Sequence, residues 1–190
     1  ALASVGDFEG AAIIFSGETG TELRLSRRGI VAYAEVLSQL ERNDDALDLI
    51  VQSFGVSLDP YLQDIKARLE AGETLNFDTV TQPSDGVAEV YFSIANALLR
   101  DAQSAYTVLY ARMASSIRTD HIDALLLSAE LLESLDRFDL ATEVYDLVPR
   151  EDPSFHAAEI GRAEALRQAG REEAAIEVLT QLTETHGHLP

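Results

Sequence analysis

The chain has 190 residues, of which 33 are acidic and 14 are basic, giving a formal charge of −19 at pH 7. This charge disfavours nucleic acids and anionic membrane surfaces as partners, because proteins bind both through clusters of basic side chains. The sequence contains no cysteine, which excludes disulfides, thiolate zinc sites and cysteine nucleophiles. No apolar run reaches the roughly 18–20 residues of a membrane-spanning helix, so we expect a soluble protein, for which cytoplasm and periplasm are both open.

Helical segments are predicted from the first residues onward. Residues 1–20 contain Gly6-Asp7-Phe8, which we interpret as the turn in the middle of a two-helix unit, so that only a partial unit is present. Because the sequence also opens at Ala1 without a methionine, we expect it to be a fragment of a longer array. Residues 27–55 predict a degenerate two-helix unit, with small and apolar residues at helical spacing.

Residues 56–86 interrupt this pattern with an inserted helix and a long loop. Asp59 followed by Pro60 is a typical helix start, an aspartate N-cap with a proline in the first turn, and Gly72 is a typical helix end. From Gly72 to Gly86 the sequence shows no helical periodicity. A loop of this length in a compact domain tends to be functional or disordered.

Three apolar side chains, Leu75, Phe77 and Val80, indicate that this loop packs against the protein. Two placements are open. In the first, the loop crosses the repeat surface and fills part of its concave face. In the second, it only covers the exposed edge of the inserted helix. The residue pattern gives both placements about equal support.

The remaining segments, 88–121, 122–155 and 156–189, repeat with a fixed period of 34 residues. The matching positions are Ala95, Ala129 and Ala163, followed by Leu98, Leu132 and Leu166. A period of this size with two amphipathic helices per unit is typical of stacked helical repeats. We interpret the alanines as points where two helices cross closely, because a larger side chain there would force the helix axes apart.

The repeat resembles the tetratricopeptide repeat (TPR), whose unit has a tight turn before an aromatic residue, small residues at the helix crossing and a proline near its end. The residues that carry the resemblance are Asp136-Arg137-Phe138 with Ala141, Tyr145 and Pro153, and Gly170-Arg171 with Ala175. The resemblance implies an all-α fold, a right-handed superhelix of antiparallel helix pairs forming a single domain over residues 1–190. The stretch from Val87 onward is also similar to TPR proteins of alphaproteobacteria that have no assigned activity.

In TPR proteins the first helices of successive units line a concave groove. Carried over to this sequence, the partner groove consists of Phe92, Asn96, Leu99, Arg100, Leu126, Leu127, Glu130, Glu133, Ile160, Glu164 and Arg167. Its apolar members would anchor a helix or an extended peptide, and its charged members would set the orientation. The alternative is that Phe92, Leu126 and Ile160 simply pack within the array.

Some TPR domains hold a C-terminal carboxylate with lysine and asparagine side chains. Here Asn96 is the one matching amide, and Phe92 stands where such a clamp needs lysine. Glu130 and Glu164 replace the other amide. We therefore expect an apolar peptide that is neutral or basic, and not a terminal carboxylate.

No residue pattern predicts catalysis, a metal or a cofactor. His156 and Glu159 lie one helical turn apart, but two ligands do not close a metal site. The stretch from Ser16 to Gly20 contains glycines but lacks the lysine and the spacing of a phosphate loop. We therefore expect a protein that is not an enzyme and that has no cofactor.

The sequence thus predicts a non-catalytic scaffold that binds a protein or peptide partner in the concave groove. Two alternatives stay open. One is a self-association module, and hence a homo-oligomer, for which an apolar outer face on the segment from Ile176 to Leu182 would be the sign. The other is the recruiting arm of a larger enzyme whose catalytic domain lies outside this sequence.

Overall fold

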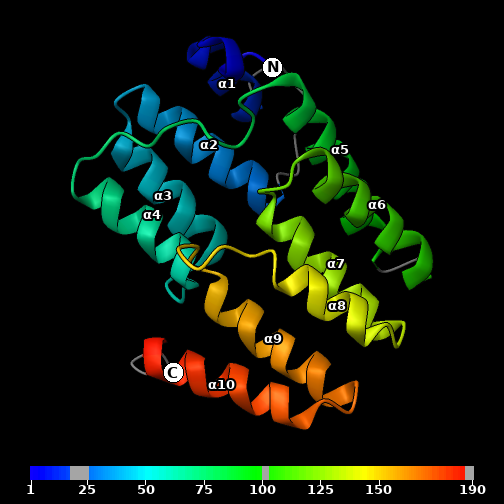
Figure 1. Ribbon diagram of the computed structural model, residues 1–190. Helices are drawn as coiled ribbons and strands as arrows, with labels where there is room; N and C mark the ends of the chain where they lie inside the picture. Colours follow the sequence, from blue (N-terminus) through cyan, green and yellow to red (C-terminus); the bar gives the residue numbers. More distant parts are fainter. Residues whose placement is uncertain (18–25, 100–102, 187–190) are drawn as a thin grey trace. The chain divides into compact units, whose positions relative to one another are not determined.

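The computed structural model describes residues 1–17, 26–99 and 103–186. These ranges contain a short 3-10 helix, Ala3–Val5, and ten α-helices but no strand, so the predicted all-α class is confirmed (Figure 1). The α-helices are α1 Phe8–Phe15, α2 Arg27–Gln39, α3 Asn43–Phe54, α4 Pro60–Glu70, α5 Pro83–Leu98, α6 Ser104–Ile117, α7 Ile122–Ser134, α8 Phe138–Tyr145, α9 Phe155–Gln168 and α10 Glu172–His186. None of those described is both long and apolar enough to cross a bilayer.

The chain forms two compact units, Ala1–Gly86 and Val87–Pro190, which we describe separately as unit 1 and unit 2. The division falls inside α5, which begins in the last residues of unit 1. In both units consecutive helices pack against each other, as the TPR-like pattern of helix pairs predicts. The repeat boundaries derived from the sequence stay a prediction.

In unit 1 the inserted helix is present and extends the pair formed by α2 and α3. The helix α4 packs on α3, next to its pairing with α2 (Figure 1). The three helices share a core of Val31, Ala34, Leu37, Ala46, Ile50, Leu58, Leu62, Ile65 and Leu69. The helix begins as expected, because the Asp59 carboxylate accepts a hydrogen bond from the Leu62 N–H at 3.1 Å. It ends before Gly72, whose φ of +77° is a conformation that glycine adopts without strain.

The predicted end of the loop is wrong. We expected residues 72–86 to be irregular, but α5 already starts at Pro83. The cause is Asp85, whose buried carboxylate accepts hydrogen bonds from the Thr81 N–H at 2.9 Å and hydroxyl at 2.7 Å and from the Gln82 N–H at 3.1 Å. Burial raises the pKa of Asp85, but these hydrogen bonds outweigh it and lower the pKa to about 2. The carboxylate therefore fixes the chain at the helix start.

In unit 2 the repeated alanines occupy equivalent buried positions. Ala95 and Ala129 have no exposed surface, and Ala163 is 3% exposed. The turns between paired helices adopt the left-handed backbone conformation, with φ of +56° at Asp136 and +75° at Gly170. The 34-residue period thus corresponds to a repeated crossing of two helices, followed by a tight reversal of the chain.

Replacing Ala129 by leucine is expected to lower the free energy of unfolding by about 1–3 kcal/mol, because the added atoms overpack a crossing that has no free surface. Urea unfolding followed by circular dichroism measures this. The matched control is Ala157→Leu on α9, where the alanine is exposed and the change should stay within about 0.5 kcal/mol. Equal losses in the two variants would show that Ala129 is not a close crossing point.

Candidate functional site

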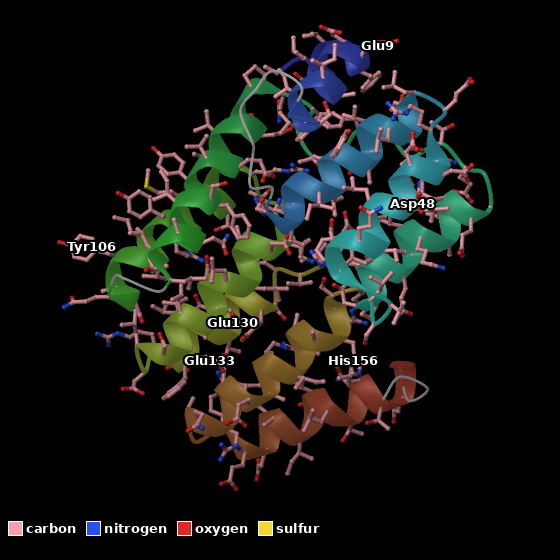
Figure 2. The ribbon with its side chains drawn as sticks, turned by 180° about the vertical axis from the view of Figure 1, so that it is seen from behind. Glu9, Asp48, Tyr106, Glu130, Glu133 and His156 are labelled. Carbon is pink, nitrogen blue, oxygen red and sulfur yellow. The ribbon has the colours of Figure 1, made fainter. Side chains whose placement is uncertain are left out.

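The described structure of unit 2 brings three of the predicted groove carboxylates together. Glu130 and Glu133 lie one turn apart on α7 (Figure 2), and Glu164 on α9 is close enough to raise the pKa of Glu133 through its charge. The Tyr145 hydroxyl reaches them from α8. We call Glu130, Glu133, Glu164 and Tyr145 the carboxylate cluster.

Tyr145 fixes the position of Glu133. Its side chain is buried, and its hydroxyl donates a hydrogen bond to Glu133 Oε2 at 2.9 Å. The ring lies against the backbone of α9 at Gly161, where an added Cβ would sit 2.5 Å from Tyr145 Cζ. Glycine is therefore required in the middle of this helix because the ring occupies the space that a side chain would need.

The electrostatics of the cluster favour an added positive charge. Partial burial raises the pKa of Glu133, the Tyr145 hydrogen bond lowers it, and the charge of Glu164 raises it again. Partial burial, together with the charge of Glu133, also raises the pKa of Glu130. Burial and the bond to Glu133 raise the pKa of the Tyr145 hydroxyl, so this group remains a donor.

One predicted cation lies beside the cluster but is already paired. Arg167 contacts the Glu164 carboxylate at 2.6 Å, one turn away on α9, and these charge-assisted bonds lower the pKa of Glu164. Within the described residues, neither Glu130 nor Glu133 forms an ion pair with a basic side chain. The cluster therefore holds two carboxylates that no cation of the described residues balances.

The predicted apolar groove residues differ in how much of each side chain is accessible. Ile160 and Leu99 are 47% and 45% exposed, and Leu126 is half-buried. Leu127 is only 9% exposed and packs with Ala95 and neighbouring residues, so it belongs to the core and leaves little surface for a partner.

Phe92 is half-buried because its ring packs against a buried histidine. The ring centroids of Phe92 and His121 are 4.7 Å apart. Asn96 is exposed, and its amide donates a hydrogen bond to the Phe92 carbonyl at 3.0 Å. Arg100, the last predicted groove residue, lies outside the described residues.

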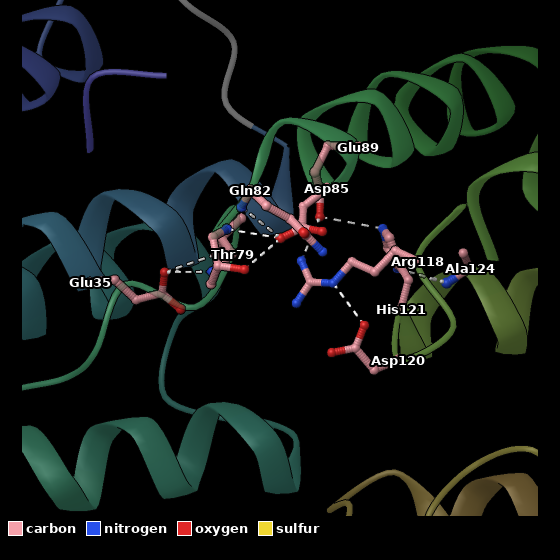
Figure 3. Close-up of polar contacts among 10 residues, drawn as sticks. Glu35, Thr79, Gln82, Asp85, Glu89, Arg118, Asp120, His121 and Ala124 are labelled. Atoms are coloured by element: carbon pink, nitrogen blue, oxygen red, sulfur yellow. Dashed lines mark hydrogen bonds and ion pairs between the residues drawn. The ribbon is translucent and has the colours of Figure 1, made fainter. Parts of the chain in front are cut away.

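His121 is a structural residue that the sequence analysis did not single out. Its Nδ1 accepts a hydrogen bond from the Ala124 N–H at 3.2 Å and so caps α7, while Nε2 lies 3.4 Å from Glu89 Oε1 (Figure 3). Its side chain has no exposed surface. The histidine at the helix start was visible in the sequence, but serine, threonine, aspartate and asparagine are the usual caps.

Glu159, considered from sequence as half of a metal-binding pair with His156, is engaged elsewhere. It is buried, and its carboxylate lies 2.8 Å from Arg162 Nε. Arg162 also contacts the Asp146 carboxylate at 2.8 Å, which ties the middle of α9 to the end of α8. Among the residues that the structure describes, no three potential metal ligands of the histidine, cysteine, aspartate or glutamate type gather.

No protein-family model matches the chain, and no curated protein matches it. Among solved structures, the chain is similar to two crystal structures of MamA, each at 16% sequence identity. The first has a TM-score of 0.49 over 98% of this chain and 93% of that one, and the second has 0.47 over 96% and 85%. Similarity at this level is not informative about ligands or activity, so we infer the function from the residues of the cluster.

Replacing Gly161 by alanine is expected to destabilise the protein by about 1–3 kcal/mol, because the new Cβ collides with the rigid Tyr145 ring. The same change within an ordinary helix stabilises by about 0.5–1 kcal/mol. Urea unfolding gives the sign of the effect directly.

A double-mutant cycle supplies the control for this prediction. In a Tyr145→Leu background the ring is absent, and Gly161→Ala should become neutral or stabilising. If Gly161→Ala changes the free energy of unfolding equally in both backgrounds, the Tyr145 ring is not the reason that position 161 requires glycine.

Proposed function

We propose that unit 2 is a non-catalytic interaction module that binds a basic, partly apolar segment of a partner protein at the carboxylate cluster. The observation that carries this proposal is the pair of unbalanced carboxylates, Glu130 and Glu133, held beside Glu164. Their raised pKa values mean that the folded protein disfavours their negative charge. A lysine or arginine side chain from a partner would stabilise that negative charge.

The surroundings of the cluster support a peptide in preference to a free cation. The exposed Ile160 lies one turn before Glu164 on α9, and the half-buried Leu126 lies one turn before Glu130 on α7. An apolar residue one turn from a carboxylate, on each of two helices, suits a segment that alternates apolar and basic side chains. The hydrogen bond from Tyr145 holds Glu133 in place before binding, which reduces the conformational entropy lost on association.

The proposal is tested with labelled synthetic peptides that combine leucine with lysine, and a matched set that combines leucine with glutamate. The lysine set should bind, more weakly at high salt and more weakly as pH falls through the range where Glu130 and Glu133 take up protons. Fluorescence anisotropy measures the binding. If the glutamate set binds equally well, the proposal is contradicted.

Variants that replace carboxylates by amides show where on unit 2 the peptide binds. Glu130→Gln/Glu133→Gln should weaken binding of the lysine set at least about tenfold, because a charge-assisted contact contributes on the order of 1.5–3 kcal/mol. The control Glu177→Gln/Glu184→Gln removes the same number of charges from exposed positions on α10 and should leave binding nearly unchanged. Equal weakening by both pairs would mean that only net charge matters.

Self-association through α10 is the second candidate function. An apolar outer face from Ile176 to Leu182 was the expected sign of this function; Ile176 and Leu179 are 64% and 45% exposed, whereas Leu182 is buried. Under this alternative the chain would sediment as a dimer or larger species, and Ile176→Ser/Leu179→Ser would return it to a monomer. Sedimentation as a monomer at all concentrations would exclude the alternative.

A further inference from the structure

Residues 73–79, which we call the strap, cross α2 as an extended segment between α4 and α5 (Figure 1). Four side chains of α2 and the start of α3 bind its main chain. The Ser38 hydroxyl accepts a hydrogen bond from the Leu75 N–H at 2.9 Å, and the Gln39 amide donates one to the Leu75 carbonyl. The other two side chains are Asn43, which contacts Glu73, and Glu35, which contacts Thr79.

The two remaining contacts lie at the ends of the strap. The Asn43 amide donates a hydrogen bond to the Glu73 carbonyl at 2.9 Å. At the other end the buried Glu35 carboxylate accepts hydrogen bonds from the Thr79 hydroxyl at 2.8 Å and N–H at 3.4 Å (Figure 3). The strap is therefore held at residues 73, 75 and 79, along most of its length.

The strap side chains that face unit 1 are apolar and enter two separate clusters. Leu75 is 3% exposed and joins the core shared by α2, α3 and α4. Phe77 packs against the cluster between α1 and α2, with its ring 6.4 Å from that of Phe8. When a protein binds an extended peptide, hydrogen bonds to the peptide main chain give affinity and pockets for alternate side chains give specificity, and the strap has contacts of both kinds.

We propose that this face of α2 is a peptide-binding surface and that the strap is its intramolecular ligand. Unit 1 then admits an outside peptide only when its own strap leaves. The partner that fits is an extended segment with leucine and phenylalanine two positions apart and a hydroxyl-bearing residue two positions further on, as in Leu75, Phe77 and Thr79. This inference concerns unit 1 and does not depend on the function proposed for unit 2.

Glu35 makes the occupancy of this surface depend on pH. Burial raises the pKa of Glu35 to about 7, against the Thr79 hydrogen bonds, which lower it. Asp78 on the strap side raises the pKa further, and Arg28 on α2 lowers it. When the strap leaves, Glu35 becomes exposed and its pKa returns toward 4.5. Glu35 therefore takes up a proton when the strap binds. The stabilisation of the bound strap is fully present below pH 4.5 and is lost as pH rises from there through about 7.

The test offers a labelled peptide of residues 72–81 to the full chain and to Phe77→Ala, which loosens the strap. The variant should bind the peptide at least about tenfold more tightly than the native chain, since its own strap competes less well. A peptide with serine at the positions of Leu75 and Phe77 should not bind. Fluorescence anisotropy measures all three, with helical circular dichroism as the check of folding.

Two further variants distinguish a binding surface from a structural cover. Phe54→Ala removes an aromatic ring from the core of unit 1 without touching the strap hydrogen bonds, and it should not increase peptide binding. If it does, or if Phe77→Ala binds no peptide, the strap is a permanent part of the fold and the proposal fails. Should Phe77→Ala unfold, Thr79→Val removes the hydroxyl contact alone and should increase binding to a smaller extent.

The pH dependence is specific to Glu35. Binding of the peptide to Phe77→Ala should weaken roughly tenfold between pH 6 and pH 8, because Glu35 is already ionised in the free protein and the proton that its burial requires is harder to supply as pH rises. Glu35→Gln in the same background should bind equally at both values. Residues 1–86 contain no histidine that could produce the same effect. Retention of the pH dependence in the glutamine variant would overturn the role of Glu35.

Discussion

A pair of amphipathic helices buries only part of its apolar surface, and another segment of the chain must cover the apolar face that is left exposed. This constraint accounts for the arrangement of each unit. In unit 2 the next helix pair supplies the cover, at crossings where alanine leaves room for close approach. In unit 1 the pair of α2 and α3 is covered by α4, which has no paired helix, and by the strap. Burying a side chain such as Leu75 contributes about 1.5–3 kcal/mol, which makes an irregular segment a stable cover.

The helices of the two units present different side chains at their surfaces, and this difference bears on function. In unit 2, α7 presents carboxylates, two of which lack a cation among the described residues. In unit 1, α2 presents Ser38, Gln39 and Glu35, which form hydrogen bonds with the main chain of the strap. On α2 the main-chain hydrogen bonds give affinity and the apolar clusters that take Leu75 and Phe77 give specificity, whereas a carboxylate cluster selects for charge.

Much of the fold was predictable because local chemistry determines it. Asp59 and Pro60 start α4 where the sequence predicted, since an N-cap acts within one turn of its own helix. The alanine period predicted the buried crossings because two helices approach closely only where the side chain between them is small. The start of α5 was not predicted, because Asp85 acts backward on Thr81 and Gln82 and no usual cap precedes Pro83.

The site was less predictable, because its contacts join distant residues. Glu133 and Tyr145 are on different helices, and only the packing of α7, α8 and α9 shows that they meet. Gly161 in the middle of α9 was a visible signal of a close approach, but not of which residue approaches. The sequence left two placements for the strap. Its contacts with Ser38 and Glu35 show that it lies against α2, while Leu75 also enters the core that α4 shares.

Native-state hydrogen exchange tests the central claim most directly, which is that a ligand-like strap covers unit 1 and can leave while the helices stay folded. The Leu75 and Thr79 amides, bonded to Ser38 and Glu35, should exchange through an opening much less costly than that of the Ile50 amide. After correction for intrinsic exchange rates, this opening should become roughly 70-fold more populated from pH 5 to pH 8. Exchange of all three amides through one global unfolding event, with no added pH dependence at the strap, would contradict the account.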